Sequence, residues 1–358
     1  MNANTRKLHD LGQRIWLDNI SREILDNGSL AHLIAELSVT GLTSNPTIFE
    51  KAIGGGAFYD RSITDLASQG AAGEDLFNQL ALEDLRRAAD LFRPIFDATN
   101  GVDGWVSLEV SPLIADDTDK TVKTAASLHQ AADRPNLFIK IPGTPAGIPA
   151  IEESIYAGIP INVTLLFSRE QYLAAAHAYM RGIERRVADG RNPEVASVAS
   201  LFVSRWDVAI KDKVSPALRN KLGIAIGKRA YRAYRDLLDS APWKRLQSIG
   251  ARPQRLLWAS TGTKDPSAPD TLYVEALAAP NTIDTMPDKT LEAFADHGNL
   301  GAPMAVDGGD AEAVLMDFKR EGVDIDALAH QLQVEGADAF VKSWHLLLAS
   351  IDAKRGKV

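Results

Sequence analysis

The chain has 358 residues, of which 45% are hydrophobic and 24% charged, a composition that excludes intrinsic disorder and supplies a large core. It contains no cysteine, which excludes disulfides, thiolate nucleophiles and cysteine-ligated metal centres and fits a reducing compartment. Lysine and arginine number 39 against 47 aspartates and glutamates, so the net charge of −8 gives no nucleic-acid-binding surface.

No export signal or membrane span is predicted. The first sixteen residues, MNANTRKLHDLGQRIW, are polar and lack the apolar stretch of a secretory signal. No segment approaches the roughly 18 apolar residues that a bilayer-spanning helix needs. We therefore expect a cytoplasmic protein that does not contact membranes.

Short apolar runs alternate with stretches of helical spacing along the chain, which is typical of βα units around a parallel sheet. Eight such units predict a closed (β/α)8 TIM barrel. An open dinucleotide-binding sheet is the alternative, but the segment after the first run, Leu17–Ile20, has no G-x-G-x-x-G fingerprint. The predicted strands are Trp16–Ile20, Gly41–Asn45, Trp105–Ser111, Leu137–Pro142, Ile161–Phe167, Ala196–Val203, Arg255–Thr261 and Asn281–Met286.

The connection between the second and third runs is long enough to hold a helical insertion. Two helical stretches, Ala57–Ser68 and Glu74–Phe92, predict an insertion over 57–98. The preceding Gly54–Gly56 lacks the Lys and Ser/Thr of a phosphate-binding loop, so we interpret it as a loop or helix stop.

Two other helices carry capping signals. Ser29 is the predicted N-cap of a helix whose apolar residues recur at helical spacing, and Ser168 with Gln171 forms a predicted capping box. The helix after Ser168 is expected to run to about Ala188. The apolar residues of the first helix are Leu30, Leu33, Ile34 and Leu37.

The chain is expected to end in helices packed on the barrel. The stretches Ala311–Arg320 and Ala337–Ala353 have helical spacing, and the second carries an apolar stripe that includes Phe340. We expect one domain over 1–358, with C-terminal helices over 310–358. If the last helix helps to close the site, deleting the residues after about Gly336 should impair turnover.

Barrel enzymes place catalytic groups at the C-terminal ends of strands, which directs attention to Lys140. An ammonium within the apolar Leu137–Pro142 is costly unless a partner compensates it. Neighbouring strands should bring Glu109 and Thr164 to either side of the amine. Burial favours the neutral amine that attacks a ketone, and a carboxylate and a hydroxyl can hold one water beside it. This constellation indicates Schiff-base chemistry.

Asp18 ends the first predicted strand and is a candidate base for a substrate hydroxyl, with a strand-end cap as its structural alternative. All seven histidines fall in predicted helices or loops, which argues against a histidine triad, and no H-E-x-x-H zinc motif is present. Carboxylate-bound magnesium is disfavoured because Lys140 competes with a cation.

Two cations follow the sixth and seventh strands, where barrels often bind phosphate. Arg205 and Lys264 together predict a phosphate clamp, in which Arg205 supplies a fork and Lys264 a point charge. Each taken alone is equally compatible with a surface charge.

Two segments, Gly41–Phe49 (GLTSNPTIF) and Phe138–Thr144 (FIKIPGT), resemble the two signature segments of the transaldolase family. The similarity extends over nearly the whole chain and is closest to the longer bacterial branch. It implies a pentose phosphate pathway enzyme that transfers a dihydroxyacetone unit from sedoheptulose 7-phosphate to glyceraldehyde 3-phosphate. The products would be erythrose 4-phosphate and fructose 6-phosphate. Further matching pieces are Trp16–Asp18, Val106–Val110, Asn162–Phe167 and Trp258–Lys264.

The resemblance also assigns roles to residues of this chain. Lys140 would form the Schiff base, Glu109 and Thr164 would position the catalytic water, and Asp18 would act as acid and base at the C4 hydroxyl. The resemblance implies no cofactor or metal, and it admits a homodimer, for which the sequence itself carries no signal. The substrate ligands would be Asn45, Asn162 and Ser200 for the hydroxyls of the dihydroxyacetone part and Arg205 for phosphate.

The chain departs from the shorter transaldolases after the seventh strand. Those proteins have an arginine soon after Ala-Ser, where this chain has Thr261–Lys264. We therefore predict Lys264 as the second phosphate ligand.

Two other functions remain open on the residues alone. A sugar-phosphate aldolase on the same fold would release free dihydroxyacetone, and it differs only in the groups that govern hydrolysis of the intermediate. A barrel that has lost catalysis and binds carbohydrate phosphates is the second alternative. The buried amine of Lys140 beside Glu109 and Asp18 argues against it, because binding alone needs no such amine.

Overall fold

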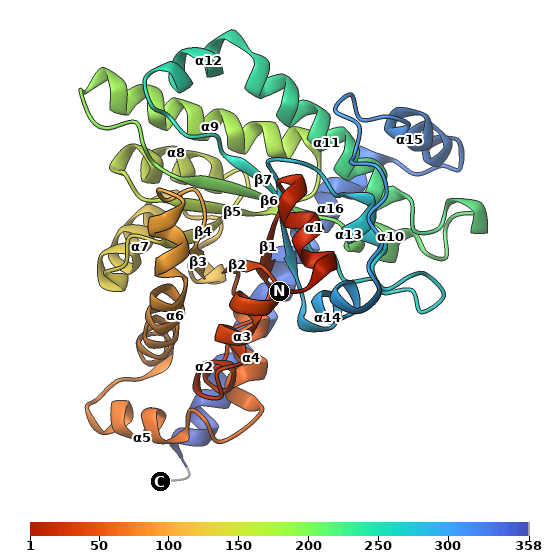
Figure 1. Ribbon diagram of the computed structural model, residues 1–358. Helices are drawn as coiled ribbons and strands as arrows, with labels where there is room; N and C mark the ends of the chain where they lie inside the picture. The colour runs from red at the N-terminus through yellow and green to blue at the C-terminus, as the bar shows by residue number, and fades with distance from the viewer. Residues whose placement is uncertain (357–358) are drawn as a thin grey trace.

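The computed structural model describes residues 1–356, in which eight parallel strands form a closed barrel in chain order (Figure 1). Each predicted run overlaps one of these strands, so the predicted (β/α)8 barrel is confirmed. The fourth predicted strand has the observed bounds. The strands are β1 Arg14–Leu17, β2 Val39–Leu42, β3 Trp105–Glu109, β4 Leu137–Pro142, β5 Ile161–Leu166, β6 Ser197–Phe202, β7 Arg255–Ala259 and β8 Ile283–Met286.

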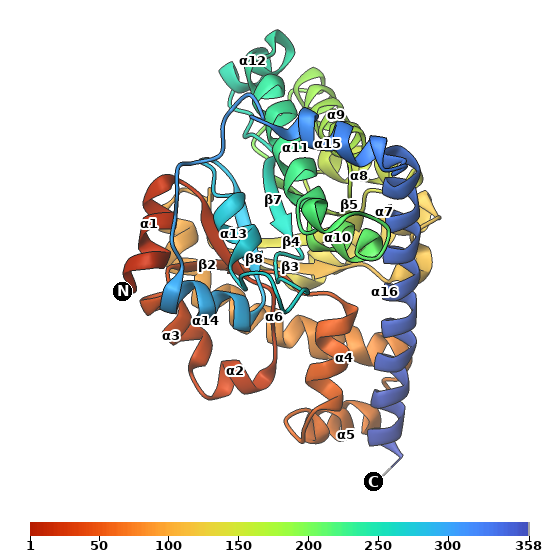
Figure 2. The same ribbon diagram turned by 90° about the vertical axis from the view of Figure 1, so that its right-hand side faces the viewer.

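Helices surround the barrel, and the predicted insertion and C-terminal helices are both present. Helices α4 to α6 lie between β2 and β3, and α14 to α16 follow β8. Figure 2 shows the long helix α16 running beside α4 and α5. The helices are α1 Ala3–Leu11, α2 Arg22–Asp26, α3 Ser29–Glu36, α4 Pro46–Gly54, α5 Asp60–Ser68, α6 Gly73–Ala98, α7 Thr118–Ala132, α8 Gly147–Ala157, α9 Arg169–Ala188, α10 Ser204–Ile210, α11 Leu222–Asp239, α12 Ala241–Ser248, α13 Leu272–Ala276, α14 Asp288–His297, α15 Ala311–Arg320 and α16 Ile325–Arg355, with short 3-10 turns at Pro112–Ile114 and Pro216–Leu218.

The strand register divides the barrel interior into an aromatic end and a polar end. Successive side chains of a strand alternate between faces, and in-register neighbours share a face. Phe138 of β4 stacks on Trp105 of β3 at 4.1 Å between ring centroids and lies 6.1 Å from Trp16 of β1. Two residues further along β4, Lys140 shares this inner face and pairs with Glu109 of β3. Aromatic rings therefore fill the N-terminal half of the barrel, and polar groups gather at the C-terminal ends.

Gly41 of β2 has no side chain, and the space that a side chain would fill is occupied by the Trp16 ring. A methyl group at this position would lie 2.7 Å from the indole of Trp16 and 2.7 Å from the Trp105 carbonyl. Because overpacking a dense core is destabilising, we expect Gly41→Ala to lower the free energy of unfolding by about 1–3 kcal/mol. Urea denaturation measures this, with Gly301→Ala as a matched control because no atom lies within 4 Å of that position. Equal stabilities of the two variants would contradict the packing argument.

The first two strands end earlier than predicted. β1 ends at Leu17, so Asp18 stands in the loop after the strand. β2 ends at Leu42, because Asn45 caps α4 by accepting a hydrogen bond from the Ile48 amide at 3.0 Å. Asn45 and the proline that follows it are typical of the start of a helix. The second predicted strand had instead included Asn45.

Several helix boundaries also differ. The predicted N-cap Ser29 is wrong: Gly28 holds the cap position with φ 79°, and the Ser29 amide donates to the side chain of Asn27. α16 begins at Ile325 rather than near Ala337, and α6 extends to Ala98.

Other local predictions are confirmed. The capping box at Ser168 is present, and the helix that it begins ends at Ala188. α4 ends at Gly54, so the triple glycine is a helix stop. All seven histidines lie in helices. No helix within residues 1–356 combines the length and hydrophobicity that crossing a bilayer requires.

Candidate active site

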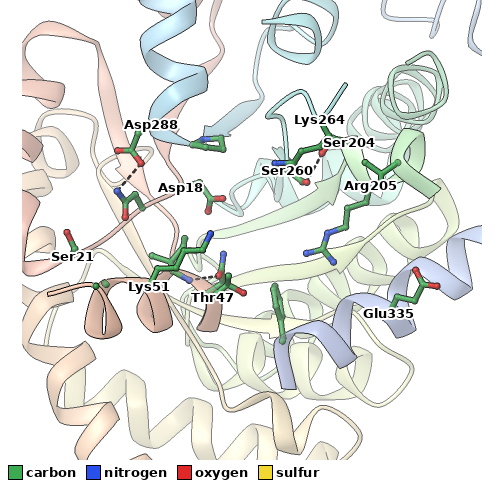
Figure 3. A pocket seen from close by; sticks show the side chains of 18 of the residues that line it. Asp18, Ser21, Thr47, Lys51, Ser204, Arg205, Ser260, Lys264, Asp288 and Glu335 are labelled. Atoms are coloured by element: carbon green, nitrogen blue, oxygen red, sulfur yellow. Dashed lines mark hydrogen bonds between the residues drawn. The ribbon is translucent and has the colours of Figure 1, made fainter. Parts of the chain in front are cut away.

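A cavity of about 1040 Å³ opens where the C-terminal ends of the strands meet. Figure 3 shows Asp18, Lys51 and Arg205 projecting into it from different elements. A narrower space of about 120 Å³ joins it and reaches Lys140. Glu109, Asn162 and Thr164 are buried near this inner space without lining it. The other predicted site residues all line it: Asp18, Asn45, Lys140, Ser200, Arg205 and Lys264.

Lys140 forms a buried ion pair with Glu109. Its Nζ lies 3.2 Å from Glu109 Oε2 and 3.1 Å from the Ser44 carbonyl oxygen, and the two side chains are 5% and 4% exposed. Burial raises the pKa of Glu109, and the charge of Lys140 opposes this increase. The pair therefore combines an amine and a carboxyl that can exchange a proton in a space largely closed to solvent.

Asp18 is a second carboxyl at the same cavity. Its Oδ1 accepts a hydrogen bond of 2.7 Å from Thr43, whose hydroxyl also lies 2.7 Å from that of Thr285. Burial raises the pKa of Asp18, whereas the charge of Lys140 and the Thr43 hydrogen bond lower it. A carboxyl held between these opposing effects is suited to acid and base chemistry.

The register places Asn162, rather than Thr164, directly opposite Lys140 on β5. Thr164 pairs with Pro142, two residues further toward the C-terminal end and on the same face. That its hydroxyl lies beside the amine stays a prediction. Within residues 1–356, Thr164 Oγ1 and Glu109 Oε1 are buried without a hydrogen-bond partner. Such atoms retain their hydrogen-bonding capacity for a small molecule.

A chain of hydrogen bonds continues from Asn162 across the barrel interior. Ser200 of β6 donates to Asn162 Oδ1 at 2.7 Å, and Asn162 Nδ2 donates to Ser107 of β3 at 3.1 Å. The chain holds Asn162 and Ser200, two of the three predicted hydroxyl ligands, because Asn162 is hydrogen-bonded to a serine on each side.

The opposite side of the cavity is cationic. Arg205 lies on α10 and Lys264 in the loop after β7, as the sequence predicts. Among residues 1–356, no carboxylate forms an ion pair with Arg205, and its guanidinium packs over the ring of Phe202 at 5.0 Å. Burial lowers the pKa of Arg205. A cation held without a carboxylate partner is suited to receive an anionic ligand.

Phe340 and Lys51 are among the residues that line the cavity and were not identified from the sequence. Phe340 of α16 lies 5.9 Å from Lys140 Nζ and 5.9 Å from the Arg205 guanidinium, although its spacing had suggested packing alone. Lys51 of α4 points into the outer cavity (Figure 3), but exposed lysines are too common for its sequence to be informative. No three potential metal-ligating side chains converge anywhere in the described part of the chain.

Comparisons with known proteins agree with this geometry. The profile of the transaldolase/fructose-6-phosphate aldolase family matches residues 15–351. The chain is 47% identical to a transaldolase of Parafrankia sp. (strain EAN1pec), an alignment that covers 98% of this chain and 99% of that protein. It is 46% identical to a transaldolase of Thermobifida fusca (strain YX), with 97% of both chains covered. A protein named transaldolase 2 from Nostoc punctiforme is 40% identical over 97% of this chain and 96% of its own length. The chain belongs to the transaldolase/fructose-6-phosphate aldolase family.

Proposed function

We infer that the protein is a transaldolase, which transfers a dihydroxyacetone unit from sedoheptulose 7-phosphate to glyceraldehyde 3-phosphate. Erythrose 4-phosphate and fructose 6-phosphate are the products. The observation that carries this function is the amine of Lys140, buried against Glu109 at the inner end of the cavity. Relatives named transaldolase align with nearly the whole chain, which supports the same reaction.

The first steps attach the donor to Lys140. The neutral amine adds to the C2 carbonyl of the ketose, and the resulting carbinolamine loses water to give an iminium ion. We assign Glu109 to the proton transfers of these steps and Thr164 to holding the water. Two observations support the assignment: the 3.2 Å contact of Glu109 with Lys140, and the buried, unpartnered oxygens of Glu109 and Thr164.

The next step breaks the C3–C4 bond. Asp18 removes the proton of the C4 hydroxyl, the aldose leaves, and the electron pair of the broken bond neutralises the iminium to give an enamine on Lys140. The enamine then attacks the aldehyde carbon of the acceptor, and Asp18 returns the proton to the new hydroxyl. Water finally hydrolyses the iminium and releases the product ketose from Lys140. The raised pKa of Asp18 supports both proton transfers.

The substrate contacts follow the polarity of the cavity. We propose that Asn45, Asn162 and Ser200 bind the hydroxyls of the dihydroxyacetone part, which their amide and hydroxyl groups suit. Arg205 and Lys264 bind the phosphate, since both cations line the inner cavity.

Lys264→Ala tests the second phosphate ligand. A charge-assisted hydrogen bond contributes about 1.5–3 kcal/mol, so KM for fructose 6-phosphate should rise by about 10- to 100-fold. Steady-state kinetics measure the change, and Lys289→Ala is the control because Lys289 is exposed and does not line the cavity. An unchanged KM in Lys264→Ala would show that the phosphate is bound elsewhere.

Dependence on the acceptor separates transfer from aldol cleavage, the second activity in the family's description. A coupled assay follows release of glyceraldehyde 3-phosphate from fructose 6-phosphate with and without erythrose 4-phosphate. Without acceptor, a transaldolase releases at most one equivalent of glyceraldehyde 3-phosphate per active site, so continued release requires the acceptor. Equal release without acceptor would identify an aldolase that sets dihydroxyacetone free.

We further propose that residues 1–358 form one domain, in which 57–98 and 310–358 are additions to the barrel. The absence of cysteine from the sequence supports a cytoplasmic location, because proteins of reducing compartments do not rely on disulfides.

The family resemblance supports a homodimer. Sedimentation equilibrium tests this state, since a dimer has twice the 38.7 kDa mass of one chain.

A further inference from the structure

The C-terminal helix α16 forms one wall of the site and carries a buried glutamine that contacts the strand ends beside it. Gln333 is 5% exposed, and its Nε2 donates to two backbone carbonyls, that of Gly143 at 3.0 Å and that of Leu165 at 2.9 Å. Gly143 directly follows β4, which carries Lys140, and Leu165 directly follows Thr164 on β5. One side chain thus joins the ends of the two strands that bear the amine and the hydroxyl.

The backbone at Leu165 is strained. Its φ of 57° is in the left-handed region, which a leucine rarely adopts. The pairing of β5 with β6 shifts register in this segment, between Val163 and Leu166. Strain of this kind is unfavourable and persists only where the surrounding structure enforces it. The hydrogen bond from Gln333 to the Leu165 carbonyl is one such constraint.

The same segment forms a closed set of hydrogen bonds around Thr164. The Gly143 amide donates to the Thr164 carbonyl at 2.7 Å, and Gln333 donates to the carbonyls of Gly143 and Leu165. The peptide group that joins Thr164 to Leu165 and the one that follows Leu165 are therefore both hydrogen-bonded. Thr164 directly precedes Leu165, so its backbone is coupled to the turn that the Gln333 hydrogen bonds hold.

The close approach of α16 is built into its sequence. A methyl group at Gly336, one turn after Gln333, would lie 2.9 Å from Leu165 Cδ2 and 3.1 Å from Arg205 Nη1. Glycine lets the helix lie this near the strand end without displacing the side chains of Leu165 and Arg205, which accounts for a glycine in the middle of a long helix. The geometry therefore fixes Gln333 at hydrogen-bonding distance from β4 and β5.

We propose that Gln333 is a positioning residue for the reaction: by holding the left-handed turn at Leu165, it directs the Thr164 hydroxyl to the water beside Lys140. Gln333 touches no reacting atom and acts through Thr164. The inference rests on the proposed function, since it requires the assigned role of Thr164.

A double-mutant cycle of Gln333→Met and Thr164→Val tests this inference in the full-length enzyme. Methionine keeps the length of the side chain and removes the donor, and valine keeps the shape and removes the hydroxyl. Misplacing a catalytic group by about 1 Å costs about 10²-fold, so we expect Gln333→Met to lower kcat by about 10- to 100-fold. KM for fructose 6-phosphate should change by less than about twofold, because uniform substrate binding is not affected.

The combination of the two substitutions distinguishes positioning from general destabilisation. If Gln333 acts through Thr164, Gln333→Met should lower kcat no further when Thr164 is already valine. Wild-type kcat in Gln333→Met, or equal fold-losses in both backgrounds, would overturn the inference. Gln331→Met is the matched control and should keep wild-type kcat, because Gln331 is exposed and bonds only to Glu335 on its own helix.

Two further results keep the test decisive. If Gln333→Met does not fold, Gln333→Asn enters the same cycle, because it retains the amide but is one methylene too short to reach both carbonyls. If Thr164→Val itself keeps wild-type kcat, the assigned role of Thr164 fails, and the role of Gln333 fails with it. Loss of kcat in Thr164→Val without loss in the Gln333 variant contradicts the positioning role alone.

Discussion

Lys140→Met is expected to lower kcat for transfer by on the order of 10⁴-fold or more, because it removes the amine that forms the covalent bond to C2. Among the residues that line this space, Lys140 and Lys264 carry primary amines, and only Lys140 is held against a buried carboxyl. Stopped and coupled assays with fructose 6-phosphate and erythrose 4-phosphate measure the loss.

The control for this variant is Lys123→Met, since Lys123 is exposed on α7 and lines neither part of the cavity. It should keep wild-type kcat. Residual turnover of Lys140→Met within about tenfold of wild type would contradict the covalent mechanism, because such a loss is smaller than removing a nucleophile produces. Ligand binding and function equal to wild type would favour a binding protein instead.

Asp18→Asn should lower kcat by about 10²- to 10⁴-fold, the range expected for loss of a general acid–base. Asparagine keeps the shape and can still accept the hydrogen bond from Thr43, so the cavity wall should be retained. The reason for the loss is specific to one step: without the carboxylate, nothing removes the proton of the C4 hydroxyl when the C3–C4 bond breaks.

Asp18→Asn distinguishes iminium formation on Lys140 from the cleavage of the C3–C4 bond that follows it. In Asp18→Asn, fructose 6-phosphate should still form the iminium on Lys140, so borohydride should trap the six-carbon donor rather than a three-carbon unit. Intact protein mass spectrometry distinguishes these two adducts. A three-carbon adduct formed at the wild-type rate would show that another residue takes the C4 proton.

The barrel could be predicted from the sequence because each buried parallel strand is a nearly continuous apolar run. β4 was predicted with its observed bounds, since Leu137–Pro142 is apolar on both faces apart from one residue. That residue is Lys140. Its charge stands out against the apolar strand, so one pattern predicts both the strand and the catalytic candidate. Asp18 and Glu109 were predicted for a related reason: a carboxyl buried at the end of an apolar strand is rarely tolerated without a partner or a function.

The sequence did not show how α16 contributes to the site. Gln333 and Phe340 have the spacing of an ordinary amphipathic helix, and their contacts with Leu165 and Lys140 join residues more than 150 positions apart. Gly336 was also misleading, because a glycine in a helical pattern suggests an end, whereas here it allows close packing. The pairing of Asn162 with Lys140 and of Thr164 with Pro142 could not be predicted either, since strand register depends on the closure of the barrel.

Borohydride trapping with peptide mapping tests the central claim most directly. Sodium borohydride added during turnover of fructose 6-phosphate reduces the iminium to a stable secondary amine, and digestion locates the adduct. We expect one adduct per chain, on the peptide that contains Lys140, and none without substrate or in Lys140→Met. An adduct on another lysine, or no adduct under turnover, would contradict the assignment of Lys140 as the Schiff-base residue.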